Sequence, residues 1–499
     1  MEKYQWGMVG LGVMGGNLAL NMAEHGIAVL GYDKQLGAAD LLHRETGGRE
    51  IAFAADIPSF VTQLARPRRV MMLVPAGPPV DDVIHDVAPR LAPDDILIDG
   101  GNSFFQDTDR RAQVLAKKGI HFLGVGISGG AEGARHGPSL MPGGPEAAYR
   151  RVQPVFETVA ARVDDQPCTA YLGSGSAGHY VKMVHNGIEY ALMQLIAETY
   201  DLLKRGLGLN DEELQATYAQ WNETELSSYL LEITHQIFSR TDERTGQPLI
   251  DVILDEARQK GTGMWASQDA MELQVPTPSI DVAVAMRHLS ALKEEREAAS
   301  WLLARAGSAR QHVRTRFLGH LRRGLYAAMI IVFAQGMALL RRASQVYGYG
   351  VNLEEVAQIW RGGCIIRAAL LNLVRAAFHA KPNLVNLVTD PRLSKEITYR
   401  QKDLRAVVRG AAEWGVPCPG FMVALSYFDA YRSAWLPANL IEAQRDYFGA
   451  HSYERVDAKG SFHTEWDEPQ ETMVATPEER TGNGARWAAD HAEEIERAR

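Results

Sequence analysis

The sequence is poor in cysteine, with three in 499 residues. Cys168, Cys364 and Cys418 stand far apart and have none of the C-x-x-C or cysteine–histidine spacings that metal sites and redox-active dithiols use. Chains that depend on disulfides for stability carry many more cysteines for their length. We therefore expect buried, unpaired thiols in a reducing compartment, and we expect no metal site.

Long hydrophobic runs and a surplus of positive charge are also missing. The sequence has no uncharged apolar stretch of about 18 residues, the length that a membrane-spanning helix needs, and its N-terminal residues lack the pattern of a signal peptide. The net charge of −9 argues against a protein whose main partner is a nucleic acid. We expect a cytoplasmic protein of two or three domains that binds neither membranes nor nucleic acids.

The first 177 residues alternate short apolar runs with helical patterns. The runs are "WGMVGLG", "IAVLGYD", "RVMMLVP", "DILIDGG" and "HFLGVGISGG", and amphipathic segments such as 13–25 and 80–91 lie between them. Such alternation predicts a parallel, doubly wound sheet with binding loops at the carboxyl ends of its strands. We therefore predict an α/β Rossmann-type dinucleotide-binding domain over residues 1–177.

Residues 178–436 have a different, helical pattern that is rich in alanine and leucine. Two stretches separated by about 140 residues resemble each other, a spacing that indicates an internal repeat. The matched pairs are Gly206 with Gly348, Asn210 with Asn352, and Trp221 with Trp360. We predict a large all-α domain with an internal helical repeat; a chance match between two amphipathic helix pairs is the alternative.

Residues 437–499 form a polar C-terminal tail that is too short of apolar residues to build its own core. It carries Tyr447, Phe448 and Tyr453 and ends in the helical pattern "ARWAADHAEEIERAR". We predict that the tail packs on a partner subunit.

A glycine-rich loop follows the first predicted strand and opens the first predicted helix. Gly10, Gly12 and Gly15 have the G-x-G-x-x-G spacing of a dinucleotide-binding loop, in which Leu11, Val13 and Met14 fill the other positions. The glycines permit the tight turn, the approach of backbone N–H groups to a pyrophosphate, and close packing of the helix on the strand. Asp33 stands about 20 residues further on, at the end of the second strand, as this fingerprint requires.

The residues that follow the second strand leave the choice of dinucleotide open. The carboxylate of Asp33 would accept hydrogen bonds from the adenosine ribose of NAD and would repel the 2′-phosphate of NADP. Lys34 would attract that phosphate.

The segment "VKMVHNGIEY" at 181–190 places five unlike polar groups on one face of a helix. At about 100° per residue they share an arc of roughly 140°, and the remaining positions are apolar or small. The five are Lys182, His185, Asn186, Glu189 and Tyr190. Two interpretations compete: a structural lysine–glutamate pair, although seven residues is far for direct contact, or a polar stripe on which a base and an acid face a substrate.

Seven motifs occur in the order of one known family, from about residue 5 to residue 453. They are "GLGVMGGN", "DGGNS", "GISGGAEGARHGPSLMPGG", "KMVHNGIEY", "QKGTG", "WRGGCIIR" and "LPANLIEAQRDYFGAH". Together they resemble the long-chain form of the decarboxylating 6-phosphogluconate dehydrogenases of the pentose phosphate pathway. The resemblance implies oxidation of 6-phosphogluconate at C3, loss of CO2, and release of ribulose 5-phosphate with NADPH.

The resemblance also implies roles for individual residues. Lys182 matches the general base and Glu189 the general acid, and such a lysine must be neutral at working pH. The other matches bind substrate: Asn102, Ser128, Gly129, Gly130, His185, Asn186 and Tyr190, with the phosphate-binding residues Lys260, Arg287 and Arg445, which His451 joins. Asn102 would also contact the cofactor. Because Arg445 and His451 lie in the tail, the resemblance implies a homodimer in which the tail completes the partner's site.

The sequence departs from the family at two places near the cofactor. In "LVPAGPP" the family usually has a lysine after the strand, where this chain has Pro75 between Val74 and Ala76, without a cation or an N–H. After the second strand the family presents Asn-Arg-Thr, where this chain has Asp33, Lys34 and Gln35. Both changes weaken the case for NADP and keep NAD as a candidate.

Two other functions compete with this interpretation. A different β-hydroxyacid dehydrogenase, such as the 3-hydroxyisobutyrate type, would share the fold and the lysine but would be shorter, without the second helical repeat and the acid at position 189. A catalytically silent dinucleotide sensor would bind the nucleotide without turnover, and would have little use for Lys182 and Glu189 two turns apart.

Overall fold

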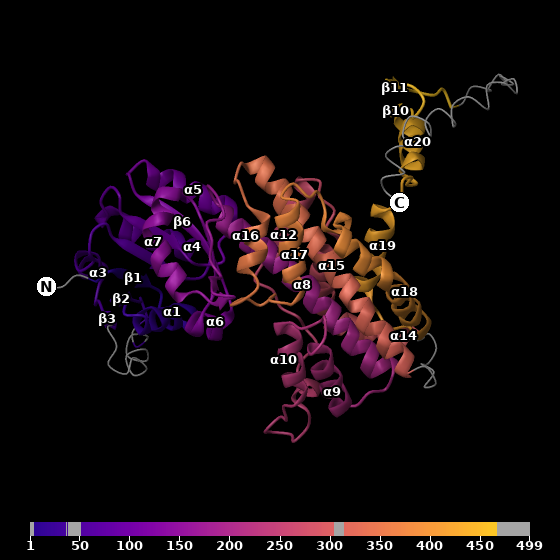
Figure 1. The fold of residues 1–499 in the computed structure, drawn as a ribbon, viewed down its shortest axis with the longest axis horizontal. Helices are drawn as coiled ribbons and strands as arrows, with labels where there is room; N and C mark the ends of the chain where they lie inside the picture. The colour runs from indigo at the N-terminus through magenta and orange to yellow at the C-terminus, as the bar shows by residue number, and fades with distance from the viewer. Residues whose placement is uncertain (1–3, 36, 38–50, 304–313, 467–499) are drawn as a thin grey trace, which may run out of the picture. The chain divides into compact units, whose positions relative to one another are not determined.

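The computed structural model describes residues 4–35, 37, 51–303 and 314–466 (Figure 1). The chain divides into two compact units, Met1–Tyr431 and Arg432–Arg499. The domain limits that the sequence suggests, at 177/178 and 436/437, stay predictions, and the final helical pattern lies outside the described residues.

A seven-stranded sheet forms the first part of the larger unit. Its order is β3-β2-β1-β4-β5-β6-β7, and all neighbours are parallel except the antiparallel pair β6 and β7. The strands are β1 (Trp6–Val9), β2 (Val29–Tyr32), β3 (Ile51–Phe53), β4 (Arg69–Met72), β5 (Ile96–Asp99), β6 (His121–Ser128) and β7 (Ser139–Gly143). The five predicted strands are confirmed. β3 and β7 were not predicted, because three residues show no periodicity and "SLMPG" contains both proline and glycine.

Helices cover both faces of this sheet. α1 (Val13–Glu24), α6 (Gly130–His136) and α7 (Glu146–Val159) share one hydrophobic core, whereas α3 (Ile57–Thr62), α4 (Pro78–Val87) and α5 (Phe105–Ala116) share the other. Successive strand residues alternate between the two cores, as the two-residue period of a strand requires: Met8 and Ile98 lie in the first, Val9 and Leu97 in the second. The structure therefore has the predicted doubly wound architecture.

Two long helices lie side by side at the centre of the helical part: α8 (Ala177–Asp201) and α15 (Arg314–Tyr347) (Figure 1). The other helices are α9 (Asp211–Asn222), α10 (Tyr229–Phe238), α11 (Leu249–Val252), α12 (Thr262–Glu272), α13 (Pro278–Ser290), α14 (Lys293–Leu302), α16 (Leu353–Ile359), α17 (Leu370–Ala380), α18 (Pro391–Trp414) and α19 (Pro419–Tyr431). Shorter pieces are the turns η1 (Ala88–Arg90), η2 (Leu202–Gly206) and η4 (Leu387–Thr389) and the hairpin β8 (Arg162–Val163) and β9 (Gln166–Pro167).

The matched positions of the sequence repeat have matched structural roles. Asn210 and Asn352 both cap the N-terminus of a helix, α9 and α16, with their side-chain oxygen, and Trp221 and Trp360 are both buried. Each short helix follows one of the two long central helices, α8 and α15. The repeat therefore consists of a long central helix followed by a short capped one.

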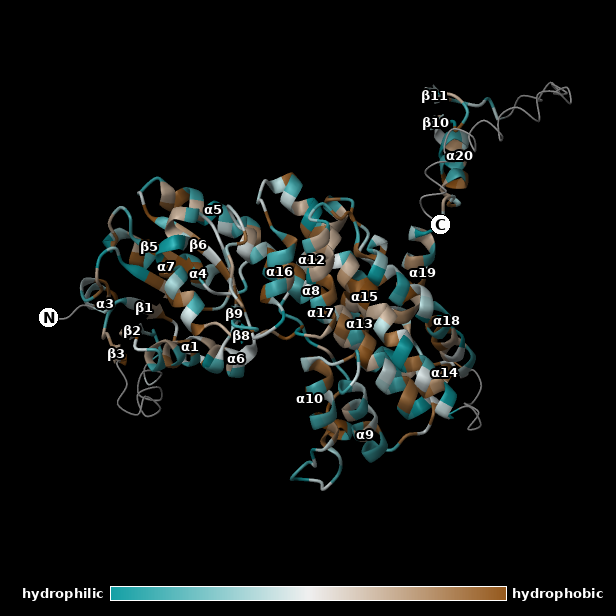
Figure 2. Ribbon diagram, viewed as in Figure 1, coloured by the Kyte–Doolittle hydropathy of each residue, from teal (hydrophilic) through white to brown (hydrophobic). Residues whose placement is uncertain are grey.

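α15 contains a long apolar stretch, part of which is seen as brown ribbon in Figure 2. Within the described residues it is the one helix that is long and apolar enough to cross a membrane by length and composition, and 89% of its apolar window is buried inside the protein. Its neighbours are α8, α18 and α19. The apolar surface of α15 is therefore used in the core of the helical part.

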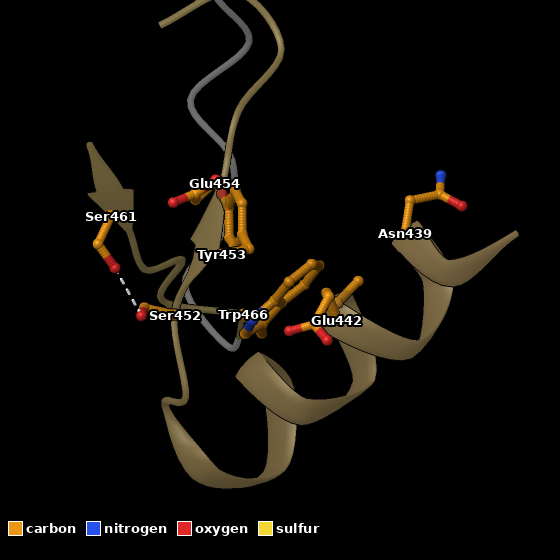
Figure 3. Close-up of a pocket in the computed structure, with 8 residues that line it drawn as sticks. Asn439, Glu442, Ser452, Tyr453, Glu454, Ser461 and Trp466 are labelled. Atoms are coloured by element: carbon orange, nitrogen blue, oxygen red, sulfur yellow. Dashed lines mark hydrogen bonds between the residues drawn. The ribbon is translucent and has the colours of Figure 1, made fainter. Parts of the chain in front are cut away.

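The C-terminal unit consists of α20 (Ala438–Gly449) and a short hairpin of β10 (Tyr453–Glu454) and β11 (Ser461–Phe462). Buried Asp446 organises it, because its carboxylate accepts hydrogen bonds from the backbone of Ser452 and Thr464 and from the indole of Trp466. A pocket of about 740 Å³ lies between α20 and the hairpin (Figure 3). Apolar side chains of α20 are exposed: Leu440, Ile441, Tyr447 and Phe448.

Candidate active site

Glycines bring α8 into direct contact with the end of the sheet. A Cβ atom on Gly126 in β6 would lie 2.3 Å from Cβ of Lys182, and one on Gly178 in α8 would lie 2.3 Å from the carbonyl oxygen of Gly124. Any side chain at these positions would push the helix away from the strand. The glycines of "HFLGVGISGG" therefore set the position of Lys182 against the last parallel strand.

In the polar stripe of α8 four of the five side chains are buried and Glu189 is half-buried, and members of the stripe contact one another and the surrounding loops. Nε2 of His185 lies 3.2 Å from Oγ of Ser128, and its Nδ1 lies 3.2 Å from Oδ1 of Asn186 and 3.7 Å from Oε2 of Glu189. Nδ2 of Asn186 donates to Oγ1 of Thr262 at 2.8 Å. The structure therefore joins the predicted residues of α8 to the predicted loop at 128–130 and to "QKGTG".

Burial shifts the two ionisable groups of this stripe toward their neutral forms. It lowers the pKa of Lys182, an effect that the charge of Glu189 partly offsets. It raises the pKa of Glu189, and the charges of Lys182 and Arg287 partly offset that rise. Within the described part of the chain no ion pair joins Lys182 to Glu189, although the charge of each group affects the pKa of the other. An amine that loses its proton easily and a carboxyl that holds one are suited to act as base and acid.

His185 is also held neutral. The pKa of its imidazole lies well below the usual value because of burial and the nearby charge of Lys182. The ring packs edge-on against Trp360, with centroids 5.6 Å apart. A neutral imidazole keeps one donor and one acceptor nitrogen, so His185 can bind hydroxyl groups without adding charge.

The loop at 128–130 interlocks with the later motif "WRGGCIIR". Gly129 has φ of 122°, and a Cβ there would lie 2.6 Å from the carbonyl oxygen of Gly363. The backbone N–H of Ile365 donates to Oγ of Ser128 at 3.4 Å, whereas Gly130 faces open space. Gly363 and Ile365 therefore support the predicted substrate loop. Their motif is part of the family resemblance, but the sequence alone gives these two residues no role, because the contact depends on the tertiary fold.

The phosphate-binding candidates are divided between the two compact units. Arg287 of α13 stacks on the ring of Tyr190, 3.7 Å from its centroid, and donates to the carbonyl of Arg258 at 2.9 Å, so it lies beside the stripe. Lys260 is exposed in the loop before α12. In the C-terminal unit Arg445 pairs with Glu442 at 2.9 Å, and the ring of His451 lies against that of Phe448.

The predicted dinucleotide loop has the geometry that its glycines imply. Gly10 has φ of 89°, and a Cβ on Gly15 would lie 1.9 Å from the carbonyl oxygen of Gly10, so the helix packs directly on the turn. Oδ2 of Asp33 accepts from the N–H of Leu11 at 2.7 Å and its Oδ1 from that of Gln35 at 2.8 Å. A pocket of about 270 Å³ opens beside the loop; its lining includes Val74, Pro75, Lys34, Asp82 and Asp86.

A buried arginine that sequence reasoning missed connects the loops after β4 and β5. Arg111 donates to both carboxylate oxygens of Asp81 at 2.9 Å, to the carbonyl of Gly77 at 3.0 Å and to Oγ of Ser103 at 3.4 Å. Asn102, which precedes Ser103 in the chain, is exposed. Arg111 therefore fixes "LVPAGPP" relative to "DGGNS". One arginine in a polar helix carries no signal of this in the sequence.

The three cysteines are buried and unpaired, as predicted. Over the described ranges no group of three or more histidine, cysteine, aspartate or glutamate side chains is arranged to hold a metal ion.

A Rossmann-type sheet with a glycine loop, contacted by a helix that carries a buried lysine and a half-buried glutamate, defines a dinucleotide-dependent dehydrogenase. Two family models match: the NAD binding domain of 6-phosphogluconate dehydrogenase at residues 5–173, and the 6-phosphogluconate dehydrogenase C-terminal domain at residues 178–466. The chain belongs to the 6-phosphogluconate dehydrogenase family.

Individual relatives match this chain over almost its whole length. The decarboxylating 6-phosphogluconate dehydrogenase of Synechococcus elongatus is 51% identical, covering 93% of this chain and 100% of that protein. An NAD(+)-dependent enzyme of the same name from Bacillus subtilis is 46% identical, covering 93% and 99%. The solved structure of Plasmodium falciparum 6-phosphogluconate dehydrogenase, studied apo, with NADP+ and with 6-phosphogluconate, is 38% identical with a TM-score of 0.89, covering 93% and 100%. The predicted family is confirmed, and a shorter β-hydroxyacid dehydrogenase is excluded.

Proposed function

We propose that this chain oxidises 6-phosphogluconate at C3 and decarboxylates the product, with Lys182 as general base and Glu189 as general acid. The observation that carries the proposal is that buried Lys182 and half-buried Glu189 lie on one face of α8 with their pKa values shifted toward the neutral forms. A silent sensor would have no use for such a pair.

Each proton in this reaction has a donor or an acceptor on α8. A bound nicotinamide dinucleotide supplies the hydride acceptor. Neutral Lys182 takes the C3 hydroxyl proton as the hydride leaves, and its ammonium then donates to the new C3 carbonyl. That carbonyl accepts the electron pair released when the bond to CO2 breaks, which gives an enediol. Glu189 donates its proton to the carbon that lost CO2 while the C3 enol hydroxyl returns its proton to neutral Lys182, and ribulose 5-phosphate forms.

The remaining residues of the site orient the substrate. Ser128, His185 and Asn186 offer hydroxyl, imidazole and amide groups, and their mutual hydrogen bonds fix their positions before substrate binds. Arg287 on Tyr190, with Lys260, supplies positive charge for the phosphate. Asn102 and the loop at 128–130 lie at the carboxyl ends of β5 and β6, where ligands of this fold bind.

Replacement of Glu189 by glutamine tests the assignment of the acid. Glutamine keeps the shape but has no proton to donate, so release of ribulose 5-phosphate is expected to slow by about 10²- to 10⁴-fold. The first hydride transfer, followed as a single-turnover burst of reduced nicotinamide, is expected to persist. Glu212→Gln, an exposed position on α9, is the matched control. Steady-state turnover within tenfold of wild type would exclude Glu189 as the acid, and no turnover of the wild-type protein with NAD or NADP would refute the function.

The C-terminal unit suits a role in a homodimer. Its α20 exposes Leu440, Ile441 and Phe448, and Arg445 stands on the same short helix. We propose that Arg445 and His451 complete the substrate site of the partner subunit in a cytoplasmic homodimer, a setting that the free cysteines support.

Mixing two inactive variants tests this arrangement. If Arg445 acts across subunits, a mixed dimer of Lys182→Ala and Arg445→Ala chains has one intact site, so reassembled mixtures are expected to regain about a quarter of wild-type activity. If Arg445 acts within its own chain, the mixture stays inactive, and the proposed exchange of tails is wrong. Separate refolding of each variant provides the control.

A further inference from the structure

The pocket beside the glycine loop is lined by more negative than positive groups. Its described lining contains three carboxylates, Asp33, Asp82 and Asp86, and one ammonium group, that of Lys34. Two of the carboxylates come from α4, which follows the "LVPAGPP" loop. Pro75, which lines the same pocket, supplies neither a cation nor an N–H.

Lys34 is paired with one of these carboxylates. Its Nζ lies 3.4 Å from Oδ2 of Asp86, and the two side chains are 57% and 39% exposed. The pair leaves the two negative charges of Asp33 and Asp82 in the pocket without a cation from its described lining. Lys34, the predicted attraction for a 2′-phosphate, is therefore paired with a carboxylate of α4.

Asp33 is oriented as an acceptor for a sugar hydroxyl. One carboxylate oxygen accepts from the N–H of Leu11 in the glycine loop and the other from the N–H of Gln35. Each oxygen has a second lone pair, so the carboxylate can accept further hydrogen bonds at the point where the adenosine ribose of a dinucleotide lies. The two bonds keep Asp33 in the pocket instead of letting it turn toward solvent.

The two dinucleotides differ at this ribose alone. NAD has a 2′-hydroxyl, which donates a hydrogen bond to a carboxylate, and NADP has a 2′-phosphate, which carries about −1.5 to −2 charges at neutral pH. The first complements Asp33, and the second places like charges together in a pocket that already has a surplus of carboxylates.

We infer that this chain prefers NAD to NADP, and that Asp86 is a specificity-determining residue because it pairs with Lys34 while Asp33 binds the ribose hydroxyl. The inference rests on the proposed function. It concerns the adenosine end of the cofactor, where no bond forms or breaks, so the chemistry on α8 is the same with either dinucleotide.

A 2′-phosphate can bind Lys34 only if the ion pair between Lys34 and Asp86 separates. Binding it to the ammonium group requires Lys34 to leave Asp86, and an exposed pair of this kind contributes at most about fivefold in an equilibrium constant. The freed carboxylate of Asp86 would then face the phosphate together with Asp33 and Asp82. Solvent screens each of these repulsions, so the expected preference for NAD is large enough to measure, about tenfold or more, and is not absolute.

The test compares kcat/KM for NAD and NADP in four proteins assayed with 6-phosphogluconate: wild type, Asp86→Asn, Lys34→Ala and the double variant. Wild type is expected to favour NAD. Asp86→Asn removes one carboxylate and frees Lys34, so its kcat/KM for NADP is expected to rise about fivefold. In the double variant that gain is expected to shrink to the part that removal of one carboxylate gives by itself, and Lys34→Ala is expected to cost more NADP efficiency in the Asp86→Asn background than in wild type.

Asp82→Asn is the matched control, because it removes a carboxylate from the same pocket and helix without releasing Lys34. Its gain with NADP is expected to be smaller than that of Asp86→Asn. Dissociation constants for NADH and NADPH, from nicotinamide fluorescence, show whether the effect arises in binding. Wild-type turnover that favours NADP, or equal gains from Asp82→Asn and Asp86→Asn, would overturn the inference and leave the proposed function intact. Absence of turnover with both dinucleotides would refute the proposed function itself.

Discussion

Replacement of Gly126 by alanine should move Lys182, the proposed base, without removing any polar group of the site. A Cβ on Gly126 would lie 2.3 Å from Cβ and 2.9 Å from Cγ of Lys182. Carbon atoms in ordinary contact are about 3.5 Å apart, so strand and helix must separate by roughly 1 Å. Because α8 is held by the core of the helical part along its length, part of this shift falls on the Lys182 side chain.

The expected consequence is a large loss of rate with a moderate loss of stability. A misplacement of about 1 Å costs on the order of 100-fold in turnover, and overpacking of this kind costs about 1–3 kcal/mol of unfolding free energy. Turnover is measured by the appearance of reduced nicotinamide with 6-phosphogluconate, and stability by urea unfolding. KM for the dinucleotide should change little, since the glycine loop at 10–15 lies on another strand.

Gly410→Ala is the matched control for this prediction. A Cβ on Gly410 in α18 would lie 2.6 Å from the ring of Phe317 in α15, so the substitution crowds the core to a similar degree away from the site. It is expected to lower stability and to leave turnover per folded molecule close to that of wild type. A folded Gly126→Ala protein with turnover within threefold of wild type would show that β6 does not position Lys182, and would refute the reasoning.

Two further predictions concern buried charges outside α8's polar stripe. Burial raises the pKa of Glu198 to about 7 from an ordinary value of 4.5, and the side chain caps α19 through the N–H groups of Gly420 and Phe421. The folded state binds this proton more tightly than the unfolded chain does. The contribution of protonated Glu198 to the free energy of unfolding is therefore complete below pH about 4.5, falls as pH rises and is absent above about 7. The resulting loss of stability is about 3 kcal/mol. Glu198→Gln should flatten this part of the stability–pH curve measured in urea; an unchanged slope would contradict the assignment. Arg111→Lys keeps the charge but loses the paired bonds to Asp81, so kcat/KM for the dinucleotide should fall about tenfold. The fall should come mainly from KM for the dinucleotide, and an equal fall for 6-phosphogluconate would indicate a general structural effect instead.

Much of the fold follows from local features of the sequence. The order of apolar runs predicted five of the strands, and the glycine spacing at 10–15 predicted the turn between β1 and α1. The polar stripe of α8 followed from helical periodicity alone, because residues three and four apart share a face in any α-helix. The family resemblance supplied the roles of Lys182 and Glu189, which periodicity left open between a salt bridge and an active site.

Other features depend on contacts between distant segments. The burial that makes Lys182 and Glu189 suited to proton transfer comes from β6 and from the helices around α8. Arg111 connects two loops from different strands, and Gly363 supports a loop far from it in sequence. None of these leaves a local pattern, because each requires the strand order of the sheet to bring its partners together.

The residues after β2 illustrate the division most clearly. The sequence by itself determined that Asp33 and Lys34 follow the second strand, where this fold typically binds an adenosine ribose, because strand, turn and glycine spacing are set by short-range geometry. It left their opposing charges undecided. The tertiary structure placed Asp86 of α4 3.4 Å from Lys34 and put Asp33 against the glycine loop. The energy of a charge depends on its neighbours in space, so only the folded chain decides which of the two residues acts on the ligand.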